Sequence, residues 1–415
     1  MSITFTKEQG EQFSEILESL GRNLDISESQ YDNAVKSYTA VGGWLSGYDS
    51  ELAMYQPTIK PQGSFMLGTM IKPIHENDDL DIDLVCQLTG KKEYWTQSDL
   101  KQIVGNRIKA NGVYERMLQR PDGRRCWTLR YSEVANYHMD ILPSIVSQGY
   151  QILLEKSFSD IEREMPNFDN LAIRITDKKH ELYTTSTQPE DWLKSNPFGY
   201  GKWFFQRAEL PRVRAFSMNE SIQEVPKFQK EKLPLQRVIQ ILKRHRDMMF
   251  NGDEAKPISI IITTLAGRAY QKETNILTAL LNIVNRISLP GFIEERFDIN
   301  CNKTIKWISN PANSNENFAD KWPENPQKQA NFYKWLAQVQ KDISQAIDQV
   351  DRGLHNIKES LQQPFGKNEV SKAFSDYGEH LRLKRELGTQ FITNTGTLGL
   401  VGTLVKNHNF HGEDK

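Results

Sequence analysis

The sequence predicts an α+β fold, in which a mixed sheet covered by helices is joined to a helical region. Short segments with alternating apolar and polar residues lie between residues 62 and 146, and apolar residues recur at helical spacing before and after that stretch. The predicted regions are N-terminal helices over 1–55, a sheet-containing core over 56–230, a helical region over 231–405 and a mobile tail over 406–415.

The composition is that of an ordinary globular protein. The 415 residues are 38% hydrophobic and 25% charged, and the net charge of −1 gives no general basic field for nucleic acid. No apolar run approaches the roughly 20 residues of a membrane helix, and no signal peptide is apparent. Cys86, Cys126 and Cys301 are far apart, which argues against disulfides and a zinc site. We therefore expect a cytoplasmic protein.

The elements before residue 150 follow from local patterns. Residues 7–22 form an amphipathic pattern, and Ser27 or Ser29 can cap a second helix. Leu80 to Leu88 alternates with period two, which predicts a strand. The pattern recurs over 126–132 and 137–141.

The second half is predicted to be helical. Pro234 begins a helix with one apolar face. Nine apolar residues between Phe332 and Leu361 recur every 3.6 residues on average, which predicts one helix of about 35 residues. A helix spanning a two-domain body and a coiled coil both fit this pattern.

Paired carboxylates are the first sign of chemistry. Asp81 and Asp83 share the polar face of the predicted strand, where like charges repel unless a cation compensates them. Asp140 lies on the polar side of another predicted strand. If the two strands are neighbours, the three aspartates can hold two metal ions about 3.5–4 Å apart, the arrangement for nucleotidyl transfer.

A glycine turn precedes the aspartate strand. Gln62-Gly63-Ser64 offers a close backbone approach and a hydroxyl to a triphosphate, whereas an ordinary turn is the simpler alternative. His138, next to Asp140, is interpreted as part of the site wall and less readily as a general base. The aromatic residues over 192–205 are interpreted as core rather than as a base-stacking surface.

These motifs together resemble a known family. Residues 61–65, 81–83 and Asp140 resemble the polymerase-β-type nucleotidyltransferase signature. More narrowly, the chain resembles the cGAS/DncV-like nucleotidyltransferases (CD-NTases, SMODS domain), the cyclic oligonucleotide synthases of bacterial CBASS antiphage systems. Segments 196–204 and 310–322 also resemble this family.

The resemblance implies a bilobal enzyme with its active site in the cleft, two Mg²⁺ ions that Mn²⁺ can replace, and NTP substrates that include ATP. It implies that Asp81, Asp83 and Asp140 are catalytic and bind metal, and that the nucleotide-binding residues are Gln62, Gly63, Ser64, Lys243 and Ser259. From the residues alone, a solvated helix face is the simpler interpretation of Lys243, and a helix N-cap explains Ser259 equally well.

Three functions remain open at this stage. The first is synthesis of a cyclic di- or trinucleotide that signals to a separate effector protein, with CBASS accessory proteins as further partners. The second is nucleotidyl transfer to RNA or protein, and the third is a catalytically inactive nucleotide sensor. The tail includes Phe410-His411-Gly412, which is similar to the reactive C-termini of some family members, although a tail without a role explains it as well.

Overall fold

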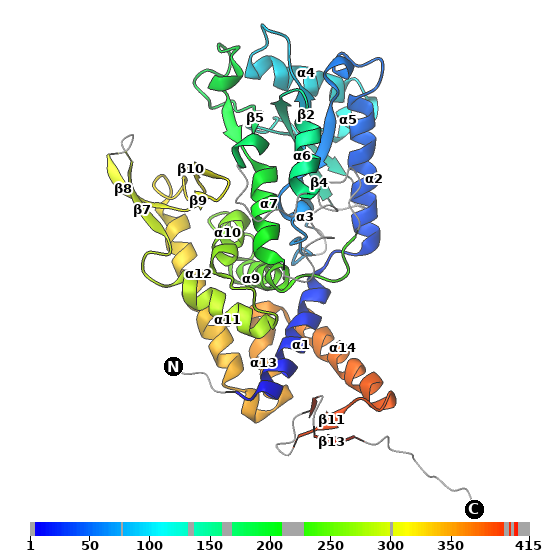
Figure 1. Cartoon of the computed structure of the whole chain (residues 1–415), viewed down its shortest axis with the longest axis vertical. Coiled ribbons are helices and arrows are strands. Elements are labelled where there is room, and N and C mark those ends of the chain that lie inside the picture. The colour runs from blue at the N-terminus through cyan, green and yellow to red at the C-terminus, as the bar shows by residue number, and fades with distance from the viewer. Residues whose placement is uncertain are drawn as a thin grey trace, which may run out of the picture. The chain divides into compact units, whose positions relative to one another are not determined.

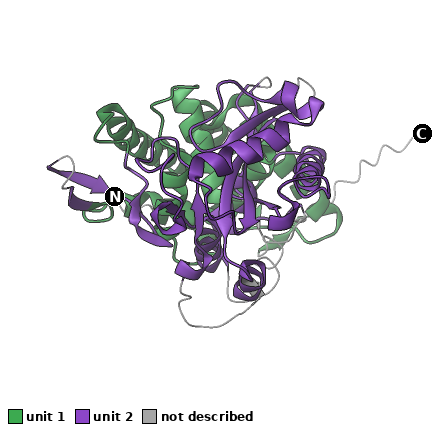
Figure 2. Ribbon diagram, turned by 90° about the horizontal axis from the view of Figure 1, so that it is seen from above, with its two compact units in different colours: residues 1–25, 237–294, 321–415 green, residues 26–236, 295–320 purple. Residues whose placement is uncertain are grey.

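The computed structural model divides the chain into two compact units (Figure 2). Unit 1 comprises residues 1–25, 237–294 and 321–415, and unit 2 comprises residues 26–236 and 295–320. The structure describes residues 5–75, 78–131, 137–159, 168–209, 228–298, 302–393, 398–399 and 402–405. Cys301 and the tail over 406–415 lie outside the described residues.

Unit 2 is built on a mixed six-stranded sheet with the order β1-β2-β4-β5-β6, in which β3 also pairs with β4. Strands β2 and β4 are parallel and the other pairs are antiparallel, so the predicted α+β class is confirmed. The strands are β1 (Thr58–Pro61), β2 (Leu80–Thr89), β3 (Trp127–Tyr131), β4 (Tyr137–Val146), β5 (Ile173–Ile175) and β6 (Leu193–Ser195).

The core of unit 2 lies on one face of this sheet. Leu80, Ile82, Leu84, Cys86 and Leu88 alternate along β2 and are all buried, as the period-two pattern predicts. Helices α2 (Glu28–Leu45) and α4 (Gln97–Lys109) contribute apolar side chains to the same cluster. The other α-helices among the described residues of unit 2 are α3 (Gly63–Met66), α5 (Gly112–Met117), α6 (Tyr150–Ser159) and α7 (Pro197–Ala208).

Both N-terminal helices begin with a capping box. Helix α1 (Lys7–Leu24) is capped by Thr6 and α2 by Ser27, where each side chain accepts from the third helical amide. The prediction of a cap at Ser27 or Ser29 is thereby resolved in favour of Ser27. In the structure, α1 belongs to unit 1 and α2 to unit 2.

Unit 1 is mostly helical (Figure 1). Helix α9 (Pro234–Phe250) begins in unit 2 and continues in unit 1. The other elements are α10 (Ser259–Ala269), α11 (Ile276–Ile287), α12 (Pro326–Ile347), α13 (Leu354–Phe365), α14 (Lys367–Glu386) and the short strands β11 (Phe391–Ile392), β12 (Leu398–Gly399) and β13 (Thr403–Leu404). Within the described ranges, no helix is long and apolar enough to cross a membrane.

The single long helix predicted over 332–361 is wrong. Helix α12 ends at Ile347, a short 3₁₀ turn follows, and α13 starts at Leu354. Gly353 between them has φ 92°, a left-handed conformation that interrupts an α-helix. The apolar spacing continues across the break because both helices bury apolar side chains, and spacing alone does not reveal the change of direction.

Besides β11, β12 and β13, four further short strands interrupt the region predicted to be helical. They are β7 (Glu294–Asp298), β8 (Lys303–Trp307), β9 (Ser309–Asn310) and β10 (Asn313–Asn317). β7 pairs with β8, and β9 pairs with β10 in antiparallel fashion. The residues of β7, β8 and β10 are largely polar and mostly at least partly exposed, and the two residues of β9 are polar but buried. These strands therefore lack the apolar alternation that identifies a strand in sequence.

Candidate active site

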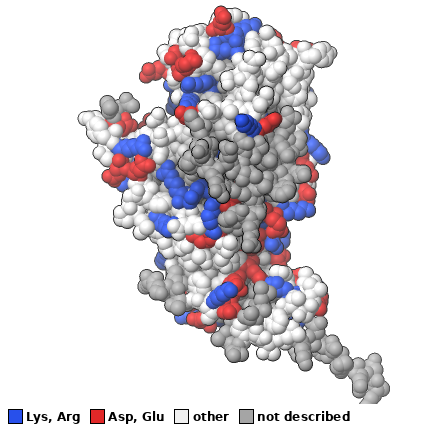
Figure 3. All heavy atoms as spheres, in the orientation of Figure 1, with Lys and Arg blue, Asp and Glu red and all other residues white. Residues whose placement is uncertain are grey.

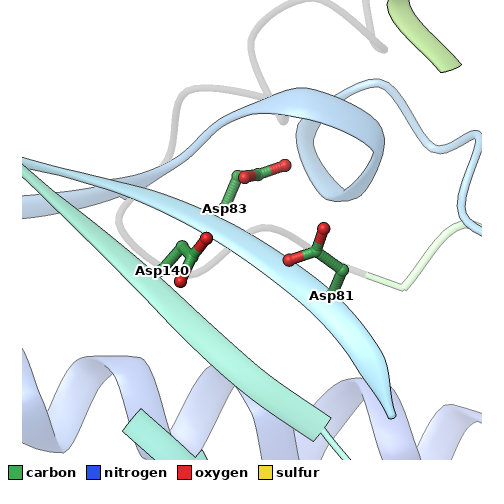
Figure 4. A group of neighbouring side chains, drawn as sticks. All are labelled: Asp81, Asp83 and Asp140. Carbon is green, nitrogen blue, oxygen red and sulfur yellow. The ribbon is translucent and has the colours of Figure 1, made fainter. Parts of the chain in front are cut away.

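The parallel pairing of β2 and β4 brings the three predicted aspartates together. In the register of the two strands Asp83 is the partner of Asp140, and Asp81 is the partner of His138. Residues two apart on a strand point to the same side, so all three carboxylates lie on the sheet face opposite the apolar core. Figure 4 shows the three carboxyl groups gathered over the two strands.

The cluster suits a hard divalent cation. Asp81, Asp83 and Asp140 each offer an oxygen atom, and these atoms lie within 4.8 Å of one another. The nearby Cys126 adds no thiolate, because its burial, followed by the charges of Asp140 and Asp83, raises the pKa of the thiol. A donor set of carboxylate oxygens that is partly open to solvent fits Mg²⁺ or Mn²⁺.

Two further side chains contact the aspartates. The Thr128 hydroxyl, on β3, donates a hydrogen bond to Oδ1 of Asp140. His138 Nε2 lies 3.1 Å from Oδ1 of Asp81, and this hydrogen bond holds the pKa of the imidazole above its usual value although burial opposes it. His138 is therefore a carboxylate-bound neighbour of the cluster.

The turn over 62–64 lies directly against Asp83. The Gln62 amide donates to the Asp83 carbonyl oxygen at 2.8 Å. Gly63 has φ 57°, and a Cβ at this position would lie 2.6 Å from Oδ2 of Asp83. Both the backbone conformation and the space therefore require glycine. Ser64 follows in the first turn of α3, so the predicted turn and the aspartates form one site in unit 2.

Lys243 and Ser259 belong to unit 1, on α9 and at the first residue of α10. Lys243 is 3% exposed, which excludes the solvated-face interpretation. Ser259 is not the N-cap of α10, since Ile258 takes that place. Its Oγ accepts a hydrogen bond of 2.9 Å from Arg246, whose Nη1 also donates to the Pro257 carbonyl.

Sequence reasoning missed Thr128 and Gln236. The Gln236 side chain is 1% exposed; its amide nitrogen donates to the Leu67 carbonyl at 2.8 Å and its oxygen accepts from the Leu233 amide at 2.8 Å. It thereby joins the start of α9 to the segment after α3. The alternation over 126–132 indicates on which face of the strand Thr128 lies. Its pairing with Asp140 could be recognised only from the register of β3 and β4.

Comparisons with known proteins agree with this geometry. Residues 57–143 match the family described as "Cyclic GMP-AMP synthase DncV-like, nucleotidyltransferase domain". A c-di-GMP synthase of Roseivirga ehrenbergii is 26% identical over 386 residues, which cover 91% of this chain and 90% of the relative. The cyclic dinucleotide synthase CdnG of Bradyrhizobium diazoefficiens is 21% identical over 92% of this chain and 87% of its own length.

Solved structures show the same fold. The structure of B. diazoefficiens CdnG in complex with GTP matches with a TM-score of 0.62 at 20% identity, over 88% of this chain and 97% of that chain. Vibrio cholerae DncV in complex with the linear intermediate 5′ pppA(3′,5′)pG matches with a TM-score of 0.51 at 14% identity, over 96% and 91%. With the domain match and the curated relatives, the chain is a nucleotidyltransferase that has a DncV-like domain over residues 57–143 and is similar to cyclic dinucleotide synthases over 91–92% of its length.

Proposed function

We propose that this enzyme is a cyclic oligonucleotide synthase that joins NTPs and releases pyrophosphate, with a cyclic dinucleotide as its product. The observation that carries the proposal is the cluster of Asp81, Asp83 and Asp140 beside the Gly63 turn. The names of the two curated relatives support a dinucleotide product. The name c-di-GMP synthase and the GTP complex of CdnG support GTP as a substrate. ATP, predicted from the family resemblance, is the second candidate substrate.

The three aspartates would divide the metal-binding role. Asp81 and Asp83 would bind both divalent ions. Asp140 would bind only the ion that activates the attacking hydroxyl. When bound, Mg²⁺ or Mn²⁺ lowers the pKa of that hydroxyl and neutralises charge on the phosphates. The protein contributes positioning, because the parallel register of β2 and β4 fixes the spacing of the carboxylates before substrate binds.

The donor triphosphate would be held by two groups of residues. Gln62, Gly63 and Ser64 bring backbone and hydroxyl groups beside Asp83. Lys243 would add a positive charge and Ser259 a hydroxyl at the start of α10, where helix amides favour anions. Arg246 donates to Ser259 Oγ, which leaves the hydroxyl proton of Ser259 available for a phosphate oxygen.

The resemblance to the CD-NTases supports a role in CBASS antiphage defence. The product would act as a second messenger for a separate effector protein in the cytoplasm, and CBASS accessory proteins would be further partners. This role depends on the identity of the product, which is therefore the first quantity to measure.

The main alternative is transfer to RNA or protein. Enzymes that elongate RNA usually present a continuous basic stripe. On the face drawn in Figure 3, lysines and arginines occur in separate groups with acidic residues among them. This distribution favours a small-molecule acceptor.

The deciding experiment incubates the purified enzyme with all four NTPs, singly and in pairs, and with Mg²⁺ or Mn²⁺. Phosphatase treatment and mass spectrometry then detect products that lack a terminal phosphate. A phosphatase-resistant cyclic dinucleotide supports the proposal. Extension of added RNA or nucleotidylation of added protein without a cyclic product would replace it with the alternative.

A further inference from the structure

Thr128 contacts the aspartate cluster through its hydroxyl group. Strands β3 and β4 are antiparallel, and Thr128 is the register partner of Asp140. Its side chain therefore lies on the same face as that carboxylate, and its hydroxyl donates to Oδ1 of Asp140. Thr128 is 8% exposed, so this hydrogen bond is largely shielded from water.

The hydrogen bond makes the two oxygens of Asp140 unequal. A threonine hydroxyl has one proton, which here is directed at Oδ1. Oδ2 remains the better electron donor for a cation. A carboxylate held in this way presents one oxygen in a fixed direction, whereas an unrestrained carboxylate can rotate and chelate.

From this geometry we propose that Thr128 is the positioning residue for Asp140, which it limits to binding one metal ion through one oxygen. The inference rests on the proposed two-metal function. Threonine suits the task in two ways: its β-branched side chain is stiff about χ1 on a strand, and it is neutral. A lysine or arginine there would orient the carboxylate but also cancel the negative charge that attracts the cation.

A purely structural role is the competing explanation, since a buried hydroxyl needs a partner wherever it lies. The chain offers a matched case in the same unit. Thr176 is fully buried, and its hydroxyl donates to the Arg125 carbonyl at 3.2 Å rather than to a metal ligand. Loss of the Thr176 hydroxyl therefore reports the structural cost alone.

The experiment compares Thr128→Val, Thr128→Ser and the control Thr176→Val in the full-length protein. Mn²⁺ binding is titrated by electron paramagnetic resonance without nucleotide, and unfolding temperatures are measured without metal. kcat and KM for the NTPs are then measured with Mg²⁺. Substitution of residues that orient metal ligands typically costs about 10- to 100-fold in metal affinity or activity.

We expect Thr128→Val to lose about 10- to 100-fold in Mn²⁺ affinity or in kcat, with KM little changed, and Thr128→Ser to recover most of the loss. Thr176→Val should retain the Mn²⁺ affinity and kcat of the unsubstituted protein. Unchanged Mn²⁺ affinity and kcat in Thr128→Val would overturn the inference, as would equal losses in Thr176→Val. Because Mn²⁺ binding is measured without turnover, failure of the unsubstituted enzyme to form a cyclic product would count against the proposed function alone.

Discussion

Asp83 and Asp140 are direct register partners across the parallel strands β2 and β4, although they lie far apart in the sequence. The adjacent positions of their carboxylates therefore follow from strand pairing rather than from a flexible loop. Asp81, two residues before Asp83, faces the same side and completes the cluster. Three negative charges this close repel one another, a cost that a bound cation removes.

Asp83→Asn is expected to lower nucleotidyl transfer roughly thousandfold or more, because the metal ions that we propose bind here would supply several kcal/mol of transition-state stabilisation. The unfolding temperature of the metal-free variant should hold or rise, since the substitution relieves charge repulsion. Pyrophosphate release and thermal unfolding measure the two effects. Asp169→Asn, which removes an exposed carboxylate paired with Lys194, serves as the control. Substantial activity in Asp83→Asn would exclude the two-metal mechanism.

Gly63→Ala is expected to lose most activity by displacing the Asp83 carboxylate. The added methyl group would lie 2.6 Å from Oδ2 of Asp83, and the residue would also have to adopt φ 57°. Gly90→Ala is a matched control, because Gly90 has φ 86° but nothing within 4 Å of the added carbon. Both variants should lose about 1–2 kcal/mol of stability through backbone strain, and only Gly63→Ala should lose activity. Equal activities would show that Gly63 is needed only for its conformation.

Sequence patterns were sufficient to locate β2 and its polar face, because those signals are local. Alternation over Leu80–Leu88 defines both faces of β2, and the polar face can be identified from Asp81 and Asp83 alone. The position of Asp140 additionally required β4 to pair with β2, a long-range fact that the family resemblance supplied. The hydrogen bond from Thr128 depends on a second pairing, that of β3 with β4, and no local pattern encodes its register.

The basic residues of α9 show why burial is harder to predict. Four basic residues on one helix suggest a solvated face, yet Arg237 is completely buried. Its guanidinium group donates hydrogen bonds to Glu18, which lies on α1, and to Asp25, the residue after α1. Both partners lie more than 200 residues earlier in the chain. Burial of a charged side chain thus depends on partners that sequence spacing cannot identify.

Lys243→Met is expected to raise the KM for NTPs about 10- to 150-fold, which corresponds to the loss of about 1.5–3 kcal/mol from a charge-assisted phosphate contact. Methionine retains much of the buried stem while it removes the charge. Lys334→Met, at an exposed position on α12, is the control. Steady-state kinetics should be recorded well below the unfolding temperature of each variant. An unchanged KM for every NTP would assign Lys243 a structural role.

Gln236→Glu is expected to disturb the contact between α9 and the segment after α3. A carboxylate can still accept from the Leu233 amide, but it cannot donate to the Leu67 carbonyl and would repel it. We expect a loss of about 1–3 kcal/mol in stability and a higher KM for NTPs, because the Gly63 turn immediately precedes this contact. Denaturant unfolding measures the loss of stability, and steady-state kinetics measure the KM for NTPs. A stability loss with unchanged kinetics would confine Gln236 to a structural role.

Asp177 makes part of the stability of unit 2 dependent on pH. Burial alone would raise the pKa of this carboxyl, but hydrogen bonds from Arg124, Arg125 and the Lys179 amide outweigh burial and hold it below its usual value. The stabilisation is therefore present above the unfolded pKa of about 3.9 and is lost as the pH falls through the lower, folded pKa. Asp177→Asn should lower the free energy of unfolding by about 1–3 kcal/mol at pH 7. The difference in free energy of unfolding between this variant and the unsubstituted protein should shrink below pH 4. Asp169→Asn, which removes a partner from an exposed ion pair, should cost less than about 1 kcal/mol. Denaturant unfolding between pH 3 and 7 measures these differences, and a constant difference for Asp177→Asn across that range would contradict the assignment.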